Sequence, residues 1–305
     1  VSHSLGTMDC DNAAFNNEYI DNIIALSSSC KNYIIHRFGI KNNDKIKVVF
    51  NSVTDNPDSA AKRQAKMTAE KIKIVFAGGS AASKSPDVVV PIVNELCKSN
   101  LPFEFYWLGI TTPPLKKFQP FKDIRLILPN DERVIVTGLI PQQQAAEIIA
   151  SCNVFLAPSR REGFPMALLE AMRIGCIPIV SDFRIANQEI IRDGINGFII
   201  SHKDIKSFVD RLSDIIENHA NYKNVYEASY KTFVEELSFP VWRKCIYSII
   251  SRGALYHKQR RVMKKYAYKA VVNRFKLLDK YNLIENYMTE VLPCAIKFYK
   301  YYKNK

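Results

Sequence analysis

Two glutamates in the segment 157–172, with the sequence APSRREGFPMALLEAM, could do chemistry. Glu162 precedes an expected helix, where Pro165 suits the first position and Gly163 permits a close backbone approach. The N–H groups at the start of a helix attract an anion such as a phosphate. Glu170 has apolar neighbours, and a buried carboxylate needs donors, which a ribose diol would supply. For each glutamate alone, the alternative is a solvated loop acid at Glu162 and an arginine or backbone pair at Glu170.

A second candidate is the glycine-rich segment 78–85, GGSAASKS, which follows an apolar stretch. It differs from a P-loop because Ser83 stands where the glycine before Lys84 belongs. No clear acidic partner at a strand end follows, unless Asp182 serves. The dinucleotide fingerprint G-x-G-x-x-G is absent as well. A P-loop NTPase and a dinucleotide-binding protein are therefore poor interpretations of this segment.

The elements that would position these residues alternate between strands and helices. Strands are expected at 73–77, 103–108, 133–138, 154–157, 176–180 and 197–200, and helices at 86–99, 142–150, 165–174 and 204–218. The strands are apolar runs, which is typical of parallel strands buried on both faces. The pattern predicts an α/β fold, a Rossmann-like doubly wound parallel sheet. Ligands of such sheets bind beyond the carboxyl ends of the strands, so the loops that follow the strands are the places for chemistry.

The chain is predicted to have three parts. Residues 1–70 form an incomplete second α/β unit and a linker, with strands at 22–27 and 47–50 around a helix at 28–38, and polar residues from 56 to 71. Residues 71–250 form the main domain. Residues 251–305 form a basic helical tail, because they hold 14 of the 43 Lys and Arg residues but only 3 of the 30 Asp and Glu residues. Cationic faces with tyrosines suit an anionic membrane surface, and the alternative is a solvated helix packed on the body. Nucleic acid is the least favoured partner.

Composition excludes several classes of protein. With 305 residues, 47% of them hydrophobic and 24% charged, the chain is neither disordered nor fibrous. It has no apolar run long enough for a membrane helix and no visible signal peptide, and the missing initiator Met indicates a processed chain or a fragment. The seven cysteines are scattered without a C-x-x-C pair, and the five histidines are dispersed. We therefore expect no disulfide framework and no metal site, and a cytoplasmic location.

The combined motifs resemble a known family. The run EGFPMALLEAM at 162–172 is similar to the nucleotide-binding domain of the family 4 glycosyltransferases, retaining enzymes with the GT-B fold. Their signature is two glutamates separated by seven residues, here Glu162 and Glu170. The segment EIIRDGING at 189–197 matches the family pattern E-x-x-x-D-G-x-N/T-G, and segments 24–27 and 49–54 resemble the family's upstream motifs. The resemblance covers about 230 residues.

The resemblance implies roles for individual residues. Glu162 would contact the donor sugar, and Glu170 would bind the ribose of the nucleotide. Lys84 stands at the position of the family's phosphate-binding lysine. The remaining expected donor-binding residues are Gly78, Gly79, Gly109, Gly138, Gly163, Phe164 and Pro165.

Two places depart from the family. Segment 51–54 has Ser52 where the family has glycine and Thr54 where it has aspartate. An arginine often follows the first glycine of the family, and this chain has Gly79 there. Either Lys84 alone faces the departing diphosphate, or Arg160, Arg161 or Arg184 reaches it. For each of these arginines a surface position is the favoured interpretation.

The function that the resemblance implies is sugar transfer. A retaining glycosyltransferase would move a sugar from a nucleotide-diphospho-sugar to a glycan or lipid-linked acceptor in surface polysaccharide synthesis, without a metal or other cofactor. Residues 71–250 would bind the donor, and residues 1–70 would be the remnant of the acceptor-side domain. The enzyme would work in the cytoplasm, at the inner face of the membrane. The alternatives are a non-catalytic protein that binds a nucleotide-sugar or a partner, and a nucleotide-sugar epimerase.

Overall fold

The computed structural model describes residues 14, 20, 22–41, 43–54, 63–64, 66, 68–110, 128–160, 164–182 and 187–254, without the side chains of 43 and 250–254. The chain divides into two units, one of residues 1–15 and 22–249 and the other of residues 16–21 and 250–305. The predicted division at 70 and 250 stays a prediction, and the predicted tail lies outside the described residues from 255 onward.

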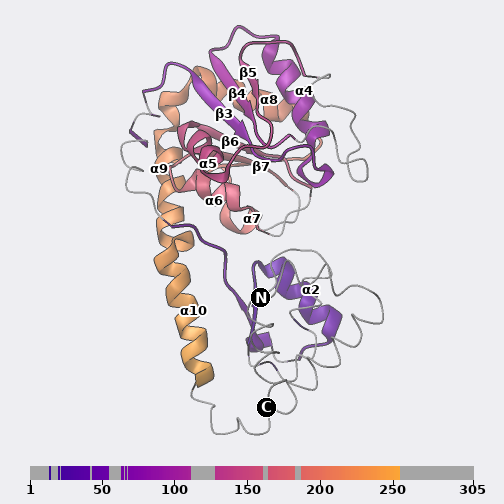
Figure 1. Ribbon diagram of the computed structural model, residues 1–305, viewed down its shortest axis with the longest axis vertical. Helices are drawn as coiled ribbons and strands as arrows, with labels where there is room; N and C mark the ends of the chain where they lie inside the picture. Colours follow the sequence, from indigo (N-terminus) through magenta and orange to yellow (C-terminus); the bar gives the residue numbers. More distant parts are fainter. Residues whose placement is uncertain are drawn as a thin grey trace. The chain divides into compact units, whose positions relative to one another are not determined.

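A six-stranded parallel sheet forms the centre of the first unit (Figure 1). Its strands are β3 (Ile72–Phe76), β4 (Phe103–Trp107), β5 (Val134–Val136), β6 (Val154–Ala157), β7 (Ile177–Ser181) and β8 (Phe198–Ile200). Their order across the sheet is β5-β4-β3-β6-β7-β8, and every neighbouring pair is parallel. This order is that of the Rossmann fold, with its reversal between β3 and β6. The predicted doubly wound α/β fold is confirmed.

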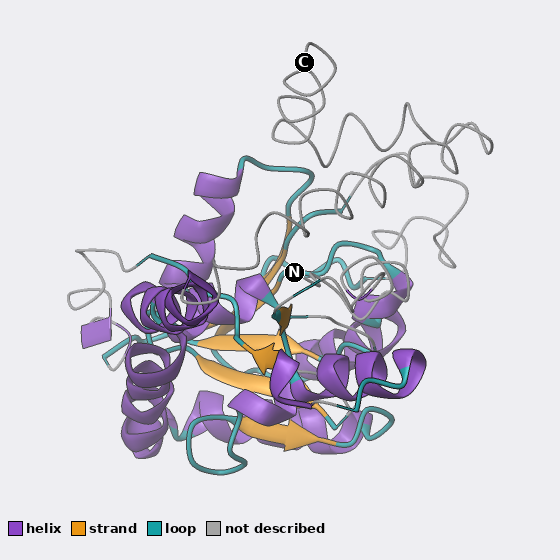
Figure 2. Cartoon of the chain, turned by 90° about the horizontal axis from the view of Figure 1, so that it is seen from below, coloured by secondary structure: helices purple, strands orange, loops and turns teal. Residues whose placement is uncertain are grey.

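Helices cover both faces of this sheet (Figures 1 and 2). The helices α4 (Pro86–Cys97) and α8 (Ile205–Glu217) pack on one face, and α5 (Gln142–Ser151) and α6 (Met166–Met172) pack on the other. Successive strand residues point to opposite faces. In β3, Ile74 and Phe76 therefore belong to the α4–α8 core, and Val75 belongs to the α5–α6 core.

The residues before the main sheet form a second, two-stranded sheet within the first unit. The strands β1 (Ile23–Ala25) and β2 (Ile46–Val48) pair in parallel, with α2 (Ser28–Phe38) between them. Ser27 caps α2 by accepting a hydrogen bond from the Cys30 amide, and Gly39 ends the helix in the left-handed region at φ 59°. The Glu189 carboxylate accepts hydrogen bonds from the Ser28 amide at 2.8 and 2.9 Å. The predicted strand–helix–strand order of this segment is confirmed.

Several elements differ from the sequence-based expectation. Helix α6 starts at Met166 with Pro165 as its N-cap, one residue later than predicted, and ends at Met172. Within the predicted linker, Arg63, Gln64 and Lys66 are helical, and Lys66 is buried. The sequence did not predict the 3-10 turns Asn43–Lys45, Ala82–Lys84 and His219–Tyr222 or the π-helical segment Phe233–Leu237. It also did not predict the helices α7 (Asn187–Ile190), α9 (Lys223–Thr232) and α10 (Phe239–Ala254). Among the described residues, no helix has the length and apolar character needed to cross a membrane.

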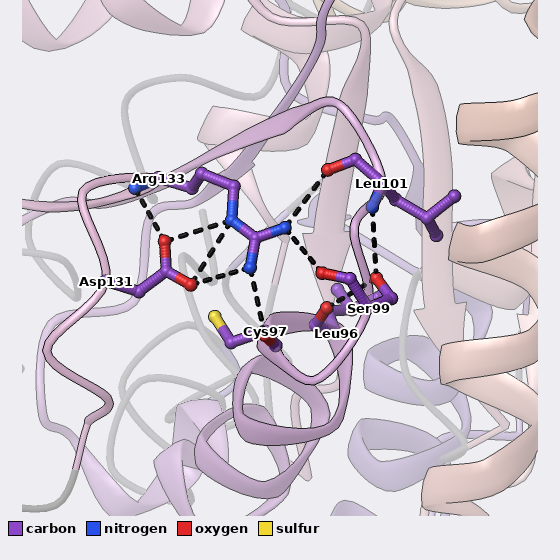
Figure 3. Close-up of polar contacts among 6 residues, drawn as sticks. All are labelled: Leu96, Cys97, Ser99, Leu101, Asp131 and Arg133. Carbon is purple, nitrogen blue, oxygen red and sulfur yellow. Dashed lines mark hydrogen bonds and ion pairs between the residues drawn. The ribbon is translucent and has the colours of Figure 1, made fainter.

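Arg133 connects the residues before β5 to the end of α4 and the loop before β4 by hydrogen bonds (Figure 3). Its guanidinium donates to the carbonyl of Cys97, the last residue of α4, at 2.9 Å, and to those of Ser99 at 2.8 Å and Leu101 at 3.1 Å, which lie between α4 and β4. It also donates to the Asp131 carboxylate at 2.7 and 3.0 Å. These hydrogen bonds lower the pKa of Asp131 far below its usual range. Arg133 thus satisfies carbonyls that the end of α4 leaves open.

Replacing this arginine should destabilise the fold. We expect Arg133→Met to lower the free energy of unfolding by about 2–3 kcal/mol, because several carbonyls and a carboxylate lose a charged donor. Urea unfolding measures the loss. The stabilisation from Asp131 exists above its unfolded pKa near 3.8 and is lost as the pH falls through its lowered folded pKa. The exposed Arg243 of α10 provides the control, Arg243→Met, with a change within about 0.5 kcal/mol. Equal stability of the two variants would contradict this role.

Candidate functional site

A small cavity lies at the carboxyl ends of β3 and β6, where the strand order reverses. Nucleotide ligands of open α/β sheets bind at this place. The cavity is lined by Phe76, Ala77, Lys84, Phe155, Leu156, Ala157, Ser159, Pro165 and Ala167. Two of the residues predicted from the sequence, Lys84 and Pro165, therefore share one cavity although 81 positions separate them in the chain.

The loop that carries Lys84 starts with a tight turn at Gly79. This residue has φ 55°, and its amide donates to the Leu108 carbonyl at 3.0 Å. The Trp107 indole donates to the Gly79 carbonyl at 2.8 Å. A Cβ atom at Gly79 would lie 2.6 Å from the carbonyl oxygen of Gly109, too close for any side chain without a shift of the backbone. The arginine that the family often carries at this position therefore has no room here.

The other predicted glycines differ in how strongly their surroundings or their backbone conformation exclude a side chain. A Cβ atom at Gly78 would lie 2.2 Å from the Phe76 ring and 2.9 Å from the Cβ of Lys84. Gly109 has φ 84°, a left-handed conformation that side chains disfavour. Gly138 has no neighbouring atom closer than 3.9 Å to a built Cβ, so packing does not demand a glycine there.

Glu170 is a half-buried carboxylate on α6. It lies one helical turn after Ala167, which lines the cavity, and residues three apart share a helix face. Its carboxylate forms no hydrogen bond or ion pair with the residues that the structure describes. Burial raises the pKa of Glu170, while Arg173 opposes this shift. A carboxylate in such a place gains stability from any ligand that offers hydroxyl donors.

Two predicted residues, Phe164 and Pro165, lie at the start of α6. Phe164 is buried and stacks on Phe50 with ring centroids 5.5 Å apart. The Pro165 carbonyl accepts a hydrogen bond from Leu168 and so begins the helix. Glu162 and Gly163 lie outside the described residues, as do Arg161 and Arg184.

Arg160 is the described member of the three candidate arginines. Its guanidinium forms an ion pair with Asp87 in the first turn of α4, with one N–O distance of 2.8 Å. Its amide donates to the Ser83 carbonyl at 2.9 Å, which ties the loop after β6 to the Lys84 loop. Asp182, considered above as the acidic partner of a P-loop, accepts a hydrogen bond from the His202 amide at 2.9 Å. Among the described residues, no cluster of His, Cys, Asp and Glu could hold a metal ion.

Two polar residues near Lys84 had no signal in the sequence. Ser85 and His202 are both buried, and Ser85 Oγ and His202 Nε2 form a hydrogen bond of 2.9 Å. They are 117 positions apart, and the contact arises because β3 and β8 end at the same edge of the sheet. No spacing rule would have linked them.

Several known glycosyltransferases are similar to this chain in sequence or in structure. The chain is 30% identical over 125 residues to the lipopolysaccharide 1,6-galactosyltransferase of Salmonella typhimurium. The matched region covers 40% of this chain and 35% of that protein. Among solved structures, Staphylococcus aureus TarM, in a complex that contains UDP, matches with a TM-score of 0.66 and 16% identity over 82% of this chain and 49% of that chain. Anabaena HepE bound to UDP-glucose matches with a TM-score of 0.64 and 15% identity over 81% of this chain and 68% of that chain.

More than half of the chain matches one protein family. The chain spans about a third to a half of the length of the first curated relatives that it matches. The family model for glycosyl transferases group 1 matches residues 58–232, more than half of the chain and all of the described cavity. The structural matches share the same doubly wound domain. The chain therefore belongs to the group 1 family of glycosyl transferases, whose domains have the GT-B fold.

Proposed function

We propose that this chain contains the donor-binding domain of a retaining glycosyltransferase that moves a sugar from a nucleotide-diphospho-sugar to a glycan or lipid-linked acceptor in surface polysaccharide synthesis. The observation that carries the proposal is Glu170, a half-buried carboxylate that forms no hydrogen bond or ion pair with the described residues and lies one helical turn after Ala167, which lines the cavity at the strand-order reversal. The named activity of the Salmonella relative supports the acceptor class. The UDP and UDP-glucose bound to two structural neighbours support a uridine nucleotide as the first ligand to test.

In this proposal each residue has a separate task. The Glu170 carboxylate accepts hydrogen bonds from the ribose hydroxyls, which replaces the lost solvation of a half-buried charge. During transfer, the bond between the anomeric carbon and the diphosphate oxygen breaks, and negative charge collects on the diphosphate. The acceptor hydroxyl oxygen forms the new bond to the anomeric carbon, and its proton passes to the departing diphosphate. Lys84, which lines the cavity, stabilises that charge with its ammonium group. Glu162 contacts the donor sugar.

The acceptor and the location belong to the same proposal. The β1–α2–β2 segment belongs to the acceptor-side domain, and the transfer takes place in the cytoplasm. The basic residues 251–305 hold the protein at an anionic membrane surface. Vesicle co-sedimentation with and without these residues tests this part, and equal recovery with anionic and neutral vesicles would contradict it.

The role of Lys84 gives a measurable prediction. We expect Lys84→Met to weaken UDP binding about tenfold in calorimetric titration, because a charged hydrogen bond to the diphosphate is lost. The control is Lys98→Met at the far end of α4, where the lysine pairs with Glu95 at the surface. It should bind UDP like the wild type. Unchanged affinity of Lys84→Met would remove Lys84 from the site, and absence of UDP binding by the wild type would overturn the proposed function.

A further inference from the structure

Ser85 has an unusual backbone conformation. Among the described residues it is the one non-glycine residue with a positive φ, at φ 61° and ψ 55°. Side chains disfavour this left-handed region, whereas glycine adopts it without strain. A serine held there needs an interaction that compensates for the strain.

The side chain of Ser85 supplies that interaction in an unexpected way. Ser85 is the N-cap residue of α4, but its hydroxyl makes no capping hydrogen bond to the helix. Ser85 Oγ and His202 Nε2 instead form a hydrogen bond of 2.9 Å, and the two residues are 0% and 4% exposed. A serine at an N-cap ordinarily bonds to the helix amides, so its hydroxyl is here committed to the histidine.

The histidine is itself held in place. The His202 amide donates to the Asp182 carboxylate at 2.9 Å, and the Asp182 amide donates to the Ile200 carbonyl at 2.9 Å. These contacts fix His202 to the ends of β7 and β8. The strained serine is therefore attached to the rigid edge of the sheet.

Ser85 controls the direction of the chain between Lys84 and α4. Its amide donates to the Ala82 carbonyl at 3.2 Å, which closes the 3-10 turn that contains Lys84. Its carbonyl accepts hydrogen bonds from Val88 and Val89, which begin α4. A change in the φ and ψ angles of Ser85 would therefore rotate the Lys84 turn relative to the helix.

We propose that His202 is a positioning residue that holds Ser85 in its left-handed conformation and so keeps Lys84 at the edge of the cavity. This inference rests on the proposed function of Lys84 as a ligand of the diphosphate. Without the histidine, Ser85 relaxes to a favoured conformation and Lys84 leaves the cavity. A glycine at position 85 makes the histidine unnecessary, because glycine adopts the same conformation unaided.

This dependence allows a rescue experiment with the whole chain and UDP. We expect His202→Ala to weaken UDP binding five- to tenfold in calorimetric titration. Ser85→Gly alone should bind within twofold of the wild type, and the double variant His202→Ala with Ser85→Gly should also return to within twofold. His202→Gln, which keeps a polar side chain at the position, should lose less affinity than His202→Ala. A double variant as weak as His202→Ala, or a His202→Ala variant with wild-type affinity, would overturn the inference.

A second measurement does not depend on UDP. In thermal unfolding, Ser85→Gly should raise the midpoint of the His202→Ala variant. In that variant the hydrogen bond to His202 no longer compensates for the left-handed conformation of Ser85, and glycine adopts this conformation without strain. In the wild-type background the same change also removes a hydrogen bond and should raise the midpoint less. Equal shifts in both backgrounds would overturn the role of His202. If the wild-type protein did not bind UDP, the proposed function alone would be overturned. The unfolding result would still decide whether His202 holds Ser85 in its left-handed conformation.

Discussion

Gly79→Ala is expected to lower the free energy of unfolding by about 3 kcal/mol or more, because a left-handed conformation costs about 1–2 kcal/mol with a Cβ atom and a backbone clash adds to it. The residue has φ 55°, and its Cβ would lie 2.6 Å from the Gly109 carbonyl oxygen. That oxygen belongs to the backbone at the end of β4, so it moves only if the loop moves. Urea denaturation followed by circular dichroism measures the loss.

Gly194 provides a matched control for this prediction. It has φ 71°, and a Cβ built there meets no atom within 4 Å. Gly194→Ala therefore has only the conformational cost of about 1–2 kcal/mol. If both variants lost the same stability, the close packing of Gly79 on Gly109 would not matter. A clearly larger loss at Gly79 would explain why this chain cannot carry an arginine beside its first glycine.

Glu170→Gln is expected to weaken UDP binding about 10- to 100-fold, because hydrogen bonds from the ribose to a charged acceptor are worth about 1.5–3 kcal/mol. Glutamine keeps the shape of the side chain but removes the charge. The control is Glu217→Gln at the exposed end of α8, which should bind UDP like the wild type. A Glu170→Gln variant with unchanged affinity would show that this carboxylate does not hold the ribose.

The same variant has a predicted effect on stability. Burial raises the pKa of Glu170 above its ordinary value of 4.5. The stability that the protonated form contributes is present below pH 4.5 and is lost as the pH rises through the raised folded pKa. Glu170→Gln should therefore be at least as stable as the wild type at pH 7. The difference in the free energy of unfolding between the variant and the wild type should grow in favour of the variant as the pH rises from acidic to neutral. A loss of stability at pH 7 would mean that the carboxylate has a partner within the protein.

The sequence predicted the main sheet well because its signals are local. Strand β6 is an uninterrupted apolar run and β7 is apolar up to Ser181, as is typical of buried parallel strands. The helix from Ser28 to Phe38 has both of its boundary signals, the Ser27 cap and Gly39. Helix α9 has neither, since its N-cap residue is Tyr222 without a side-chain cap hydrogen bond. Its existence depends on packing against α6 and β7, which one sequence does not reveal.

The candidate site was predictable to a similar degree. Lys84 and Pro165 follow strands that end at the same edge, so the fold alone brings them to one cavity. The Ser85–His202 hydrogen bond and the Arg160–Asp87 ion pair depend on the paths of loops between strands. Loops have no periodic pattern from which such contacts could be derived. The reason for Gly79 likewise became visible only with the carbonyl of Gly109 beside it.

In the proposed complex, Glu170 holds the ribose of a nucleotide whose diphosphate lies beside Lys84. A crystal structure of the chain with UDP would show both contacts at once. We expect ribose hydroxyls within hydrogen-bond distance of the Glu170 carboxylate and diphosphate oxygens within reach of the Lys84 ammonium. UDP bound away from the ends of β3 and β6, or bound there with the Glu170 carboxylate turned away from the ribose, would contradict it.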